Sequence, residues 1–141
     1  GEISTQTVVI LESDTLNLPS FSLTPDKTST ELGKKIFSAL MPPFSQFIPQ
    51  DIDFDSRPLF SKFYLLQGTR KNEGAVRKLF NHEVIRYYEI QKGLCTDGAG
   101  NTIICYSLGE QLTPEDISSF LDQSIEVCEM FKRAGHLSSA T

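Results

Sequence analysis

The chain has few of the residues on which most catalytic and metal sites depend. Its 141 residues include two histidines and three cysteines. Three cysteines do not build the disulfide framework of a small secreted domain, and they fall short of the four ligands of a structural zinc site. We therefore expect Cys95, Cys105 and Cys128 to be buried free thiols. A bond between Cys95 and Cys105 stays an open alternative, because these two residues flank a predicted hairpin loop.

A long apolar run and an excess of basic residues are also missing. No stretch approaches the roughly 18 consecutive apolar residues that a membrane-spanning helix needs. The 18 acidic residues outnumber the 13 basic ones, which gives a net charge of −5 and a pI ≈ 5.0. This balance argues against non-specific nucleic-acid binding, so we expect no nucleic-acid partner.

The first residue and the low cysteine content bear on the location of the protein. The chain begins at Gly1 rather than at a methionine, so we expect a natural start to have been removed. A membrane tether is then expected only in a segment upstream of Gly1. Because few cysteines favour a reducing compartment, we expect the cytoplasm or the cytoplasmic face of a membrane.

Hydrophobic patterning predicts one α+β domain over residues 1–135, followed by a flexible tail at 136–141. The composition, 39% hydrophobic and 22% charged, is sufficient for a packed core. We expect a mainly antiparallel sheet of about five strands with three or four helices on one face, in the order ββ-α-β-α(α)-ββ-α. The expected strands are 5–12, 21–24, 60–68, 94–97 and 102–108, and the expected helices are 30–41, 72–80, 82–91 and 113–135.

Two of these strands carry apolar residues on both faces. In the first, the two-sided pattern runs from Val8 to Leu11 and predicts a largely buried strand. In the other, it runs from Phe63 to Leu66 and predicts a central position in the sheet.

The last helix has the strongest start signal in the chain. Thr113 is a good N-cap, Pro114 suits the first helical position, and acidic residues follow in the first turn. Gly135 is expected to end the helix. Apolar residues at helical spacing predict a core-facing side, made of Ile117, Phe120, Leu121, Ile125, Cys128 and Phe131.

Three carboxylates at alternate positions form a candidate metal site. Asp51, Asp53 and Asp55 would project to one side of an extended segment, because the side-chain period of a strand is two. Crowded carboxylates are ligands for a hard cation such as calcium or magnesium. The alternative is a solvated sheet edge from which Ile52 and Phe54 pack inward.

A second candidate is an anion site between a strand and a helix. Gly68, Arg70, Lys71 and Gly74 supply backbone donors and two cations at such a junction. The spacing departs from the phosphate-binding loop of nucleotide-binding proteins, and the hydroxyl that binds magnesium is missing. An ordinary strand-to-helix turn is the alternative.

A third candidate is a partner-binding segment rich in proline and apolar residues. Phe44, Phe47 and Ile48 lie between prolines, and such a segment either docks against a partner or covers its own core. Nucleophilic catalysis has less support: the sequence has no Gly-x-Ser-x-Gly elbow, and His82 is expected at a helix start. The glycine-rich segment 97–101 is typical of a tight loop.

Several segments resemble a family of uncharacterised bacterial α+β domains, mainly over residues 60–121. The likeness rests on Phe60–Gly68, Ala75–Phe80, Gly98–Gly100 ahead of Ile103–Tyr106, and Pro114–Asp116. Members of this family often carry hydrophobic N-terminal helices ahead of the soluble part. The resemblance therefore implies the soluble part of a membrane-tethered protein, and it implies no activity, cofactor or catalytic residue.

Together these features predict a non-catalytic domain without a cofactor. The leading hypothesis is a module that binds a protein partner, or the soluble part of a membrane-tethered protein. The alternative hypothesis is a small metal-dependent hydrolase that uses the three aspartates, or an anion- or nucleotide-binding domain at Gly68–Gly74.

Overall fold

The computed structural model of the chain describes residues 7–25, 50–91, 93–107 and 113–139, with the backbone alone for Gln50, Ser107 and 136–139. Two predictions lie outside these residues: the helix at 30–41 and the partner-binding segment with Phe44, Phe47 and Ile48.

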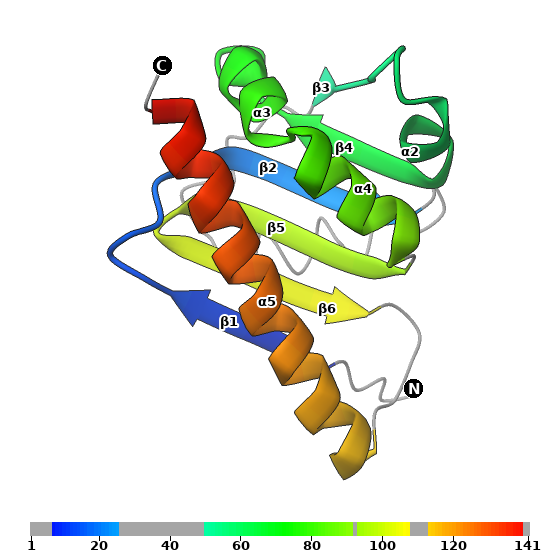
Figure 1. The fold of residues 1–141 in the computed structure, drawn as a ribbon, viewed down its shortest axis with the longest axis vertical. Coiled ribbons are helices and arrows are strands. Elements are labelled where there is room, and N and C mark those ends of the chain that lie inside the picture. Colours follow the sequence, from blue (N-terminus) through cyan, green and yellow to red (C-terminus); the bar gives the residue numbers. More distant parts are fainter. Residues whose placement is uncertain (1–6, 26–49, 92, 108–112, 140–141) are drawn as a thin grey trace, which may run out of the picture.

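Six strands form one antiparallel sheet in the order β1-β6-β5-β2-β4-β3 (Figure 1). The strands are β1 (Val8–Glu12), β2 (Leu18–Pro25), β3 (Gln50–Asp51), β4 (Tyr64–Gly68), β5 (Leu94–Gly100) and β6 (Thr102–Ser107). The described helices are α2 (Pro58–Phe63), α3 (Glu73–Leu79), α4 (His82–Ile90) and α5 (Pro114–Ser139). The predicted antiparallel α+β fold is confirmed.

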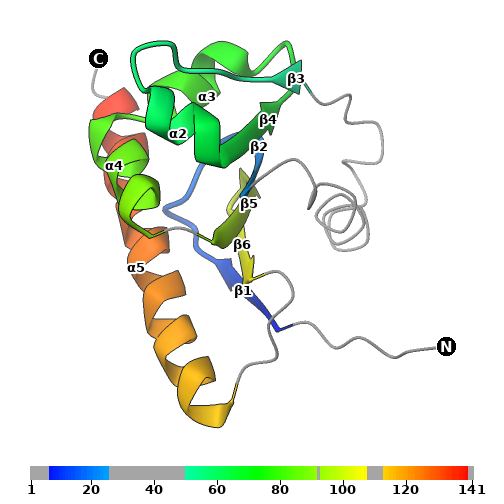
Figure 2. The ribbon, with the colours of Figure 1, turned by 90° about the vertical axis from the view of Figure 1, so that its right-hand side faces the viewer.

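The four described helices lie on one face of the sheet (Figure 2). The long helix α5 runs obliquely across β5, β6 and β1, as expected for an element that follows the β5–β6 hairpin. Between the helices and the sheet lies an aromatic cluster of three fully buried rings, with centroids 5.1 Å apart for Phe21 and Phe80, and 5.3 Å for Phe21 and Phe131. Burial of rings of this size dominates the stability of the core.

Cap residues set two helix starts as predicted. The Asn81 side chain accepts a hydrogen bond from the Val84 N–H at 3.1 Å, so α4 begins after a break from α3. At α5, the Thr113 hydroxyl accepts from the Asp116 N–H at 3.2 Å, and the Asp116 carboxylate accepts from the Thr113 N–H. This reciprocal pair is a capping box.

The first strand is an edge strand, and the prediction that it is largely buried is wrong. β1 pairs with β6 on one side and is the last strand of the sheet on the other, within the described residues. Ile10 is consequently 48% exposed. Apolar residues on both faces indicated burial, but strand order depends on long-range pairing that local patterning does not specify.

The segment before β4 is helical rather than extended. Pro58 occupies the first turn of α2, where its missing N–H costs no hydrogen bond, and the strand starts only at Tyr64. β4 lies between β2 and the two-residue edge strand β3, so it is not central. At the other end of the chain, α5 continues through Gly135 to Ser139, because Gly135 does not adopt the positive φ of a helix-ending glycine.

Candidate functional site

The three aspartates of the predicted metal site are exposed along the β3 edge. Asp51 accepts a hydrogen bond from the Gln67 side chain at 3.1 Å, while the intervening Ile52 is buried in the core. The Asp53 main-chain carbonyl accepts from Arg77 at 2.8 Å. Among the described residues no group of three histidine, cysteine, aspartate or glutamate side chains is arranged to hold a metal ion. The metal site therefore stays a prediction.

The predicted anion site at Gly68–Gly74 is a short turn into α3. The Thr69 carbonyl and hydroxyl both accept from the Asn72 N–H, at 3.1 and 3.2 Å. A Cβ at position 68 would meet Ile52 Cδ1 at 3.0 Å, so close packing explains Gly68. Arg70 and Lys71 are exposed, as is Gly74. These contacts are those of an ordinary strand-to-helix connection, and anion binding there stays a prediction.

The three cysteines are free and buried, as predicted. In the β5–β6 register Cys95 lies opposite Tyr106, and Cys105 lies opposite Thr96. Cys95 and Cys105 are therefore offset by one residue and project to opposite faces of the sheet. This offset removes the alternative of a disulfide between them.

The segment 97–101 is mostly strand rather than loop. β5 continues to Gly100, whose φ of 57° forms the tight turn into β6. Asp97 is therefore in the sheet and completely buried, where the Tyr106 hydroxyl donates a hydrogen bond to its carboxyl group at 3.3 Å.

Burial governs the ionisation of Asp97. Desolvation raises the pKa of this carboxyl to about 7, although the nearby Ser22 hydroxyl, Tyr106 hydroxyl and Leu23 N–H act in the opposite direction. Carboxyl oxygen Oδ1 has no hydrogen-bond partner of normal geometry among the described residues. Because no part of Asp97 is exposed, a substrate does not reach this group in the structure.

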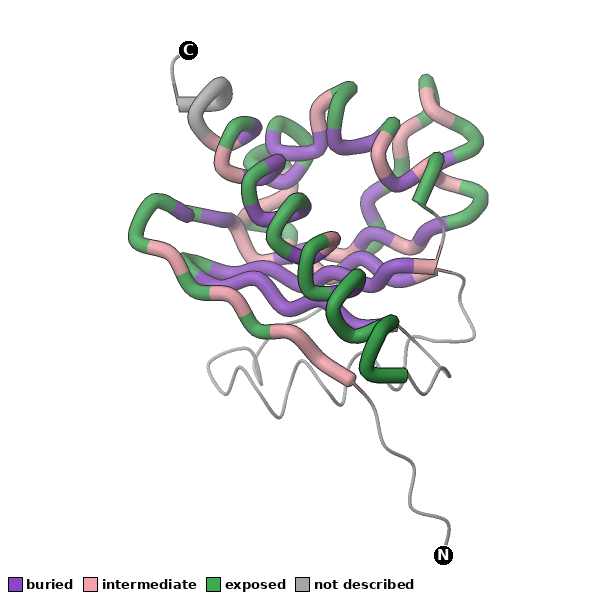
Figure 3. The backbone as a smooth tube through the Cα atoms, turned by 60° about the horizontal axis from the view of Figure 1, so that its bottom comes forward, coloured by how far each residue is buried: buried purple, intermediate pink, exposed green. Residues whose placement is uncertain are grey.

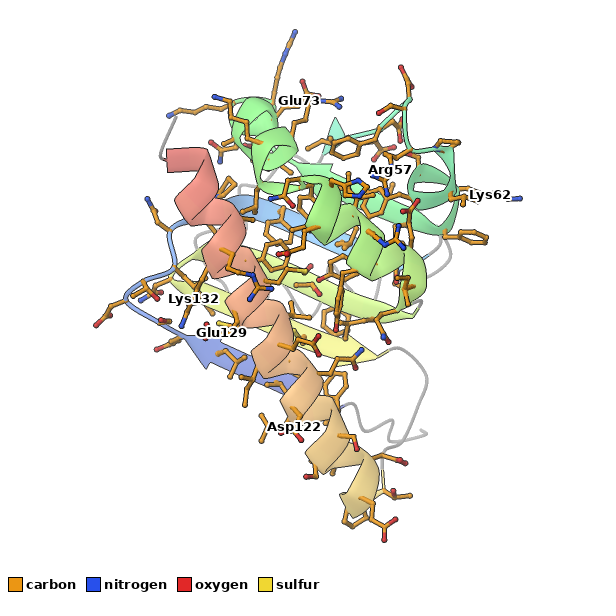
Figure 4. The ribbon with its side chains drawn as sticks, in the orientation of Figure 1. Arg57, Lys62, Glu73, Asp122, Glu129 and Lys132 are labelled. Carbon is orange, nitrogen blue, oxygen red and sulfur yellow. The ribbon has the colours of Figure 1, made fainter. Side chains whose placement is uncertain are left out.

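A polar cluster ties α2 to α4. The Arg57 guanidinium lies 2.7 Å from His82 Nδ1 and also pairs with Glu89 on the same helix (Figure 4). A guanidinium can only donate, so His82 Nδ1 is the acceptor in this contact. The cluster satisfies its own charges, so its role is to hold two helices together.

A row of apolar side chains remains exposed on α5. Ile117, Leu121 and Ile125 are 41%, 42% and 46% exposed. They follow one another at intervals of four residues, about 40° apart around the helix axis. We call these three residues the α5 stripe. Their helical spacing predicts a place in the core, and this prediction is wrong because the face formed by Phe120, Val127 and Phe131 already covers the sheet.

The α5 stripe lies on the flank of α5 that faces away from α4. Gln123, roughly 160° from Leu121 around the axis, donates a side-chain hydrogen bond to Gln91 at the end of α4. Lys132 lies on the stripe side, and it lines a surface pocket of ≈ 320 Å³ together with Thr15 and Asn17 of the β1–β2 turn. The stripe is therefore on the side of α5 where the edge of the sheet lies.

That edge is β1, and α5 extends beyond it. The 26 residues of α5 span about 39 Å, and its first half reaches past β1 in both ribbon views (Figures 1 and 2). Residues 113–119 are all exposed, as the green end of α5 shows (Figure 3). The overhanging half of α5 and the outer edge of β1 thus frame a surface that no described element covers.

Acidic residues predominate around this surface, although Lys132 on the stripe side pairs with Glu129 at 3.1 Å. Residues 7–17 and 113–129 contain no lysine, arginine or histidine. Asp122 and Glu129 are both on α5, with Lys132 following them (Figure 4). The acidic residues of the two segments are Glu12, Asp14, Glu115, Asp116, Asp122, Glu126 and Glu129.

Comparison of the chain with protein-family models, with curated proteins and with solved structures gave no match in any of the three. The resemblance to a bacterial α+β family therefore stays an expectation. In the described part of the chain, no helix has both the length and the apolar character needed to cross a bilayer. The case for a function rests on the surface formed by β1 and α5.

Proposed function

We propose that this chain is a non-catalytic protein-interaction module whose binding surface is the α5 stripe together with the outer edge of β1. The observation that carries the proposal is the row of Ile117, Leu121 and Ile125, three large apolar side chains left exposed beside the edge of β1 that pairs with no strand among the described residues. Exposed apolar groups scattered singly are ordinary, whereas a contiguous row is typical of a contact surface.

The polar groups of the described residues support a binding role over a catalytic one. The carboxyl group with a strongly raised pKa, Asp97, is buried, and the polar cluster at Arg57 is satisfied internally. An active site needs titratable groups that converge where a substrate can reach them. The acidic and apolar residues of β1 and α5 instead form an extended surface.

The proposal is tested by comparing two double variants of matched chemistry. Leu121→Gln/Ile125→Gln removes apolar groups from the stripe. Leu59→Gln/Ile90→Gln removes two exposed apolar groups on α2 and α4, which are 59% and 64% exposed. Both variants should unfold with a free energy within about 0.5 kcal/mol of the wild type, because exposed substitutions rarely cost more.

Each form is produced with an affinity tag in the native cell, and the co-isolated proteins are quantified by mass spectrometry. We expect a partner that co-isolates equally with the wild type and the α2/α4 variant and falls at least about tenfold with the stripe variant, which corresponds to roughly 1.4 kcal/mol of binding free energy. Identical sets and amounts of protein with all three forms would refute the proposal.

A further inference from the structure

We infer that the partner is an extended, basic segment that adds to the sheet as a seventh strand beside β1; this inference rests on the proposed function. β1 is hydrogen-bonded to β6 on one side, and no described strand pairs with its other side. Every second residue of such an edge presents its backbone N–H and C=O outward, which is a template for another strand.

The position of α5 favours an added strand over a helix. A strand next to β1 lies about 4.8 Å farther out, on the side of the sheet past which the first half of α5 extends. The overhang therefore covers one face of that strand, and the α5 stripe lies beside it. Side chains on that face of the added strand continue the layer that Val9 and Leu11 form against the core.

The alternating side chains of β1 indicate which residues the added strand needs on its other face, the one that points away from α5. Ile10, 48% exposed, projects to the face without described helices, and Glu12 projects to the same face two residues later. A lysine or arginine on the added strand would pack its methylene groups on Ile10 and place its charge near Glu12. The matching segment alternates apolar residues, facing α5, with basic residues.

Charge complementarity selects such a segment over a second copy of this chain. Residues 7–17 and 113–129 carry seven acidic side chains and no basic one. Two copies joined through β1 would place these acidic surfaces against one another, which costs binding free energy. The same acidic residues attract a basic segment, which raises its association rate and favours it over acidic competitors.

The experiment uses three synthetic peptides and the ¹⁵N-labelled chain. The first alternates lysine and valine over eight residues, the second replaces lysine with glutamate, and the third is the lysine peptide N-methylated at alternate residues. N-methylation removes the backbone donors of one edge while keeping every side chain. Binding is followed by NMR chemical shifts and by amide hydrogen exchange in Val8–Glu12.

We expect the lysine peptide to slow exchange of the outward-facing β1 amides at least tenfold. Its affinity should exceed that of the glutamate and N-methylated peptides by about tenfold or more, and it should fall as salt screens the charges. Leu121→Gln/Ile125→Gln should weaken binding at least fivefold, whereas Leu59→Gln/Ile90→Gln should leave it unchanged.

Three results would overturn the inference. If the N-methylated peptide binds as tightly as the lysine peptide, the partner does not add as a strand. If the glutamate peptide binds equally well, charge does not select the partner. If no peptide affects β1 while the co-isolated partner still depends on Leu121 and Ile125, the interaction surface stands and the strand-addition mode is wrong.

Discussion

Replacing Asp97 with asparagine should remove a large part of the pH dependence of folding stability. The pKa of this carboxyl is raised from 3.8 to about 7 by burial. The folded state therefore keeps a proton between these two pH values that the unfolded state has already released. The contribution of Asp97 to stability is therefore fully present below about pH 4, falls as the pH rises, and levels off above about pH 7.

The magnitude follows from the size of the shift. Each pKa unit corresponds to about 1.36 kcal/mol, so ionisation of Asp97 should lower the free energy of unfolding by about 4 kcal/mol between pH 4 and pH 8. In Asp97→Asn the side chain has nearly the same shape, is neutral at every pH, and still accepts from the Tyr106 hydroxyl. This part of the pH dependence should then be absent.

Urea denaturation at intervals from pH 4.5 to 8 measures the effect. The quantity to plot is the wild-type free energy of unfolding minus that of Asp97→Asn, because contributions from the other titrating groups cancel in it. Asp53→Asn is the matched control, because it makes the same substitution at an exposed carboxyl group. If the Asp97→Asn difference varies by less than about 1 kcal/mol across this range, the carboxyl is not desolvated as the structure indicates.

Three further predictions concern the sheet and its packing. Gly98→Ala should destabilise the fold by about 1–3 kcal/mol, because its Cβ would meet a phenylalanine ring of β2 at 2.6 Å. Gly74→Ala in α3 is the control and should stabilise the fold by about 0.5–1 kcal/mol, because nothing lies within 4 Å of its Cβ. Equal urea midpoints for the two variants would contradict this prediction. Tyr88→Phe should cost about 1–3 kcal/mol in thermal or urea unfolding, because it leaves the buried Thr96 hydroxyl without its 2.6 Å partner, and a loss below about 0.5 kcal/mol would count against that bond. The three thiols of the folded protein should react slowly with Ellman's reagent. Cys128 should react fastest, because it is the least buried of the three. A fast phase that survives Cys128→Ser would contradict this, because it would show that another thiol is accessible.

Local chemistry predicted those parts of the fold that depend on nearby residues. The starts of α4 and α5 follow from Asn81 and Thr113, whose side chains each cap a backbone N–H three positions away. The β5–β6 hairpin is likewise a pairing between neighbours in sequence. In each of these elements the residues that determine the structure lie within a few positions of one another.

Features that depend on distant pairing were not predictable in the same way. β1 pairs with β6, about 95 residues later in the chain, so its edge position and the exposure of Ile10 depend on a partner that local patterning does not identify. The burial of Asp97 has the same origin, because its neighbours in the sheet come from both β2 and β6.

The exposure of the α5 stripe was not predictable for a related reason. Ile117, Leu121 and Ile125 are spaced as a buried helix face would be, and the sequence alone does not show that α5 extends past the sheet. One signal was present: together with Phe120, Val127 and Phe131 they give α5 an apolar sector wider than one sheet contact buries.

Site-specific photo-crosslinking tests the central claim most directly. A photoreactive amino acid is placed at position 121 in the stripe or at position 90 on α4, and each protein is irradiated in the native cell. We predict a discrete adduct with one partner from position 121, absent from position 90 and lost when Ile125→Gln is added. Adducts of the same pattern and yield from both positions, or none from position 121, would contradict an interaction surface at β1 and α5.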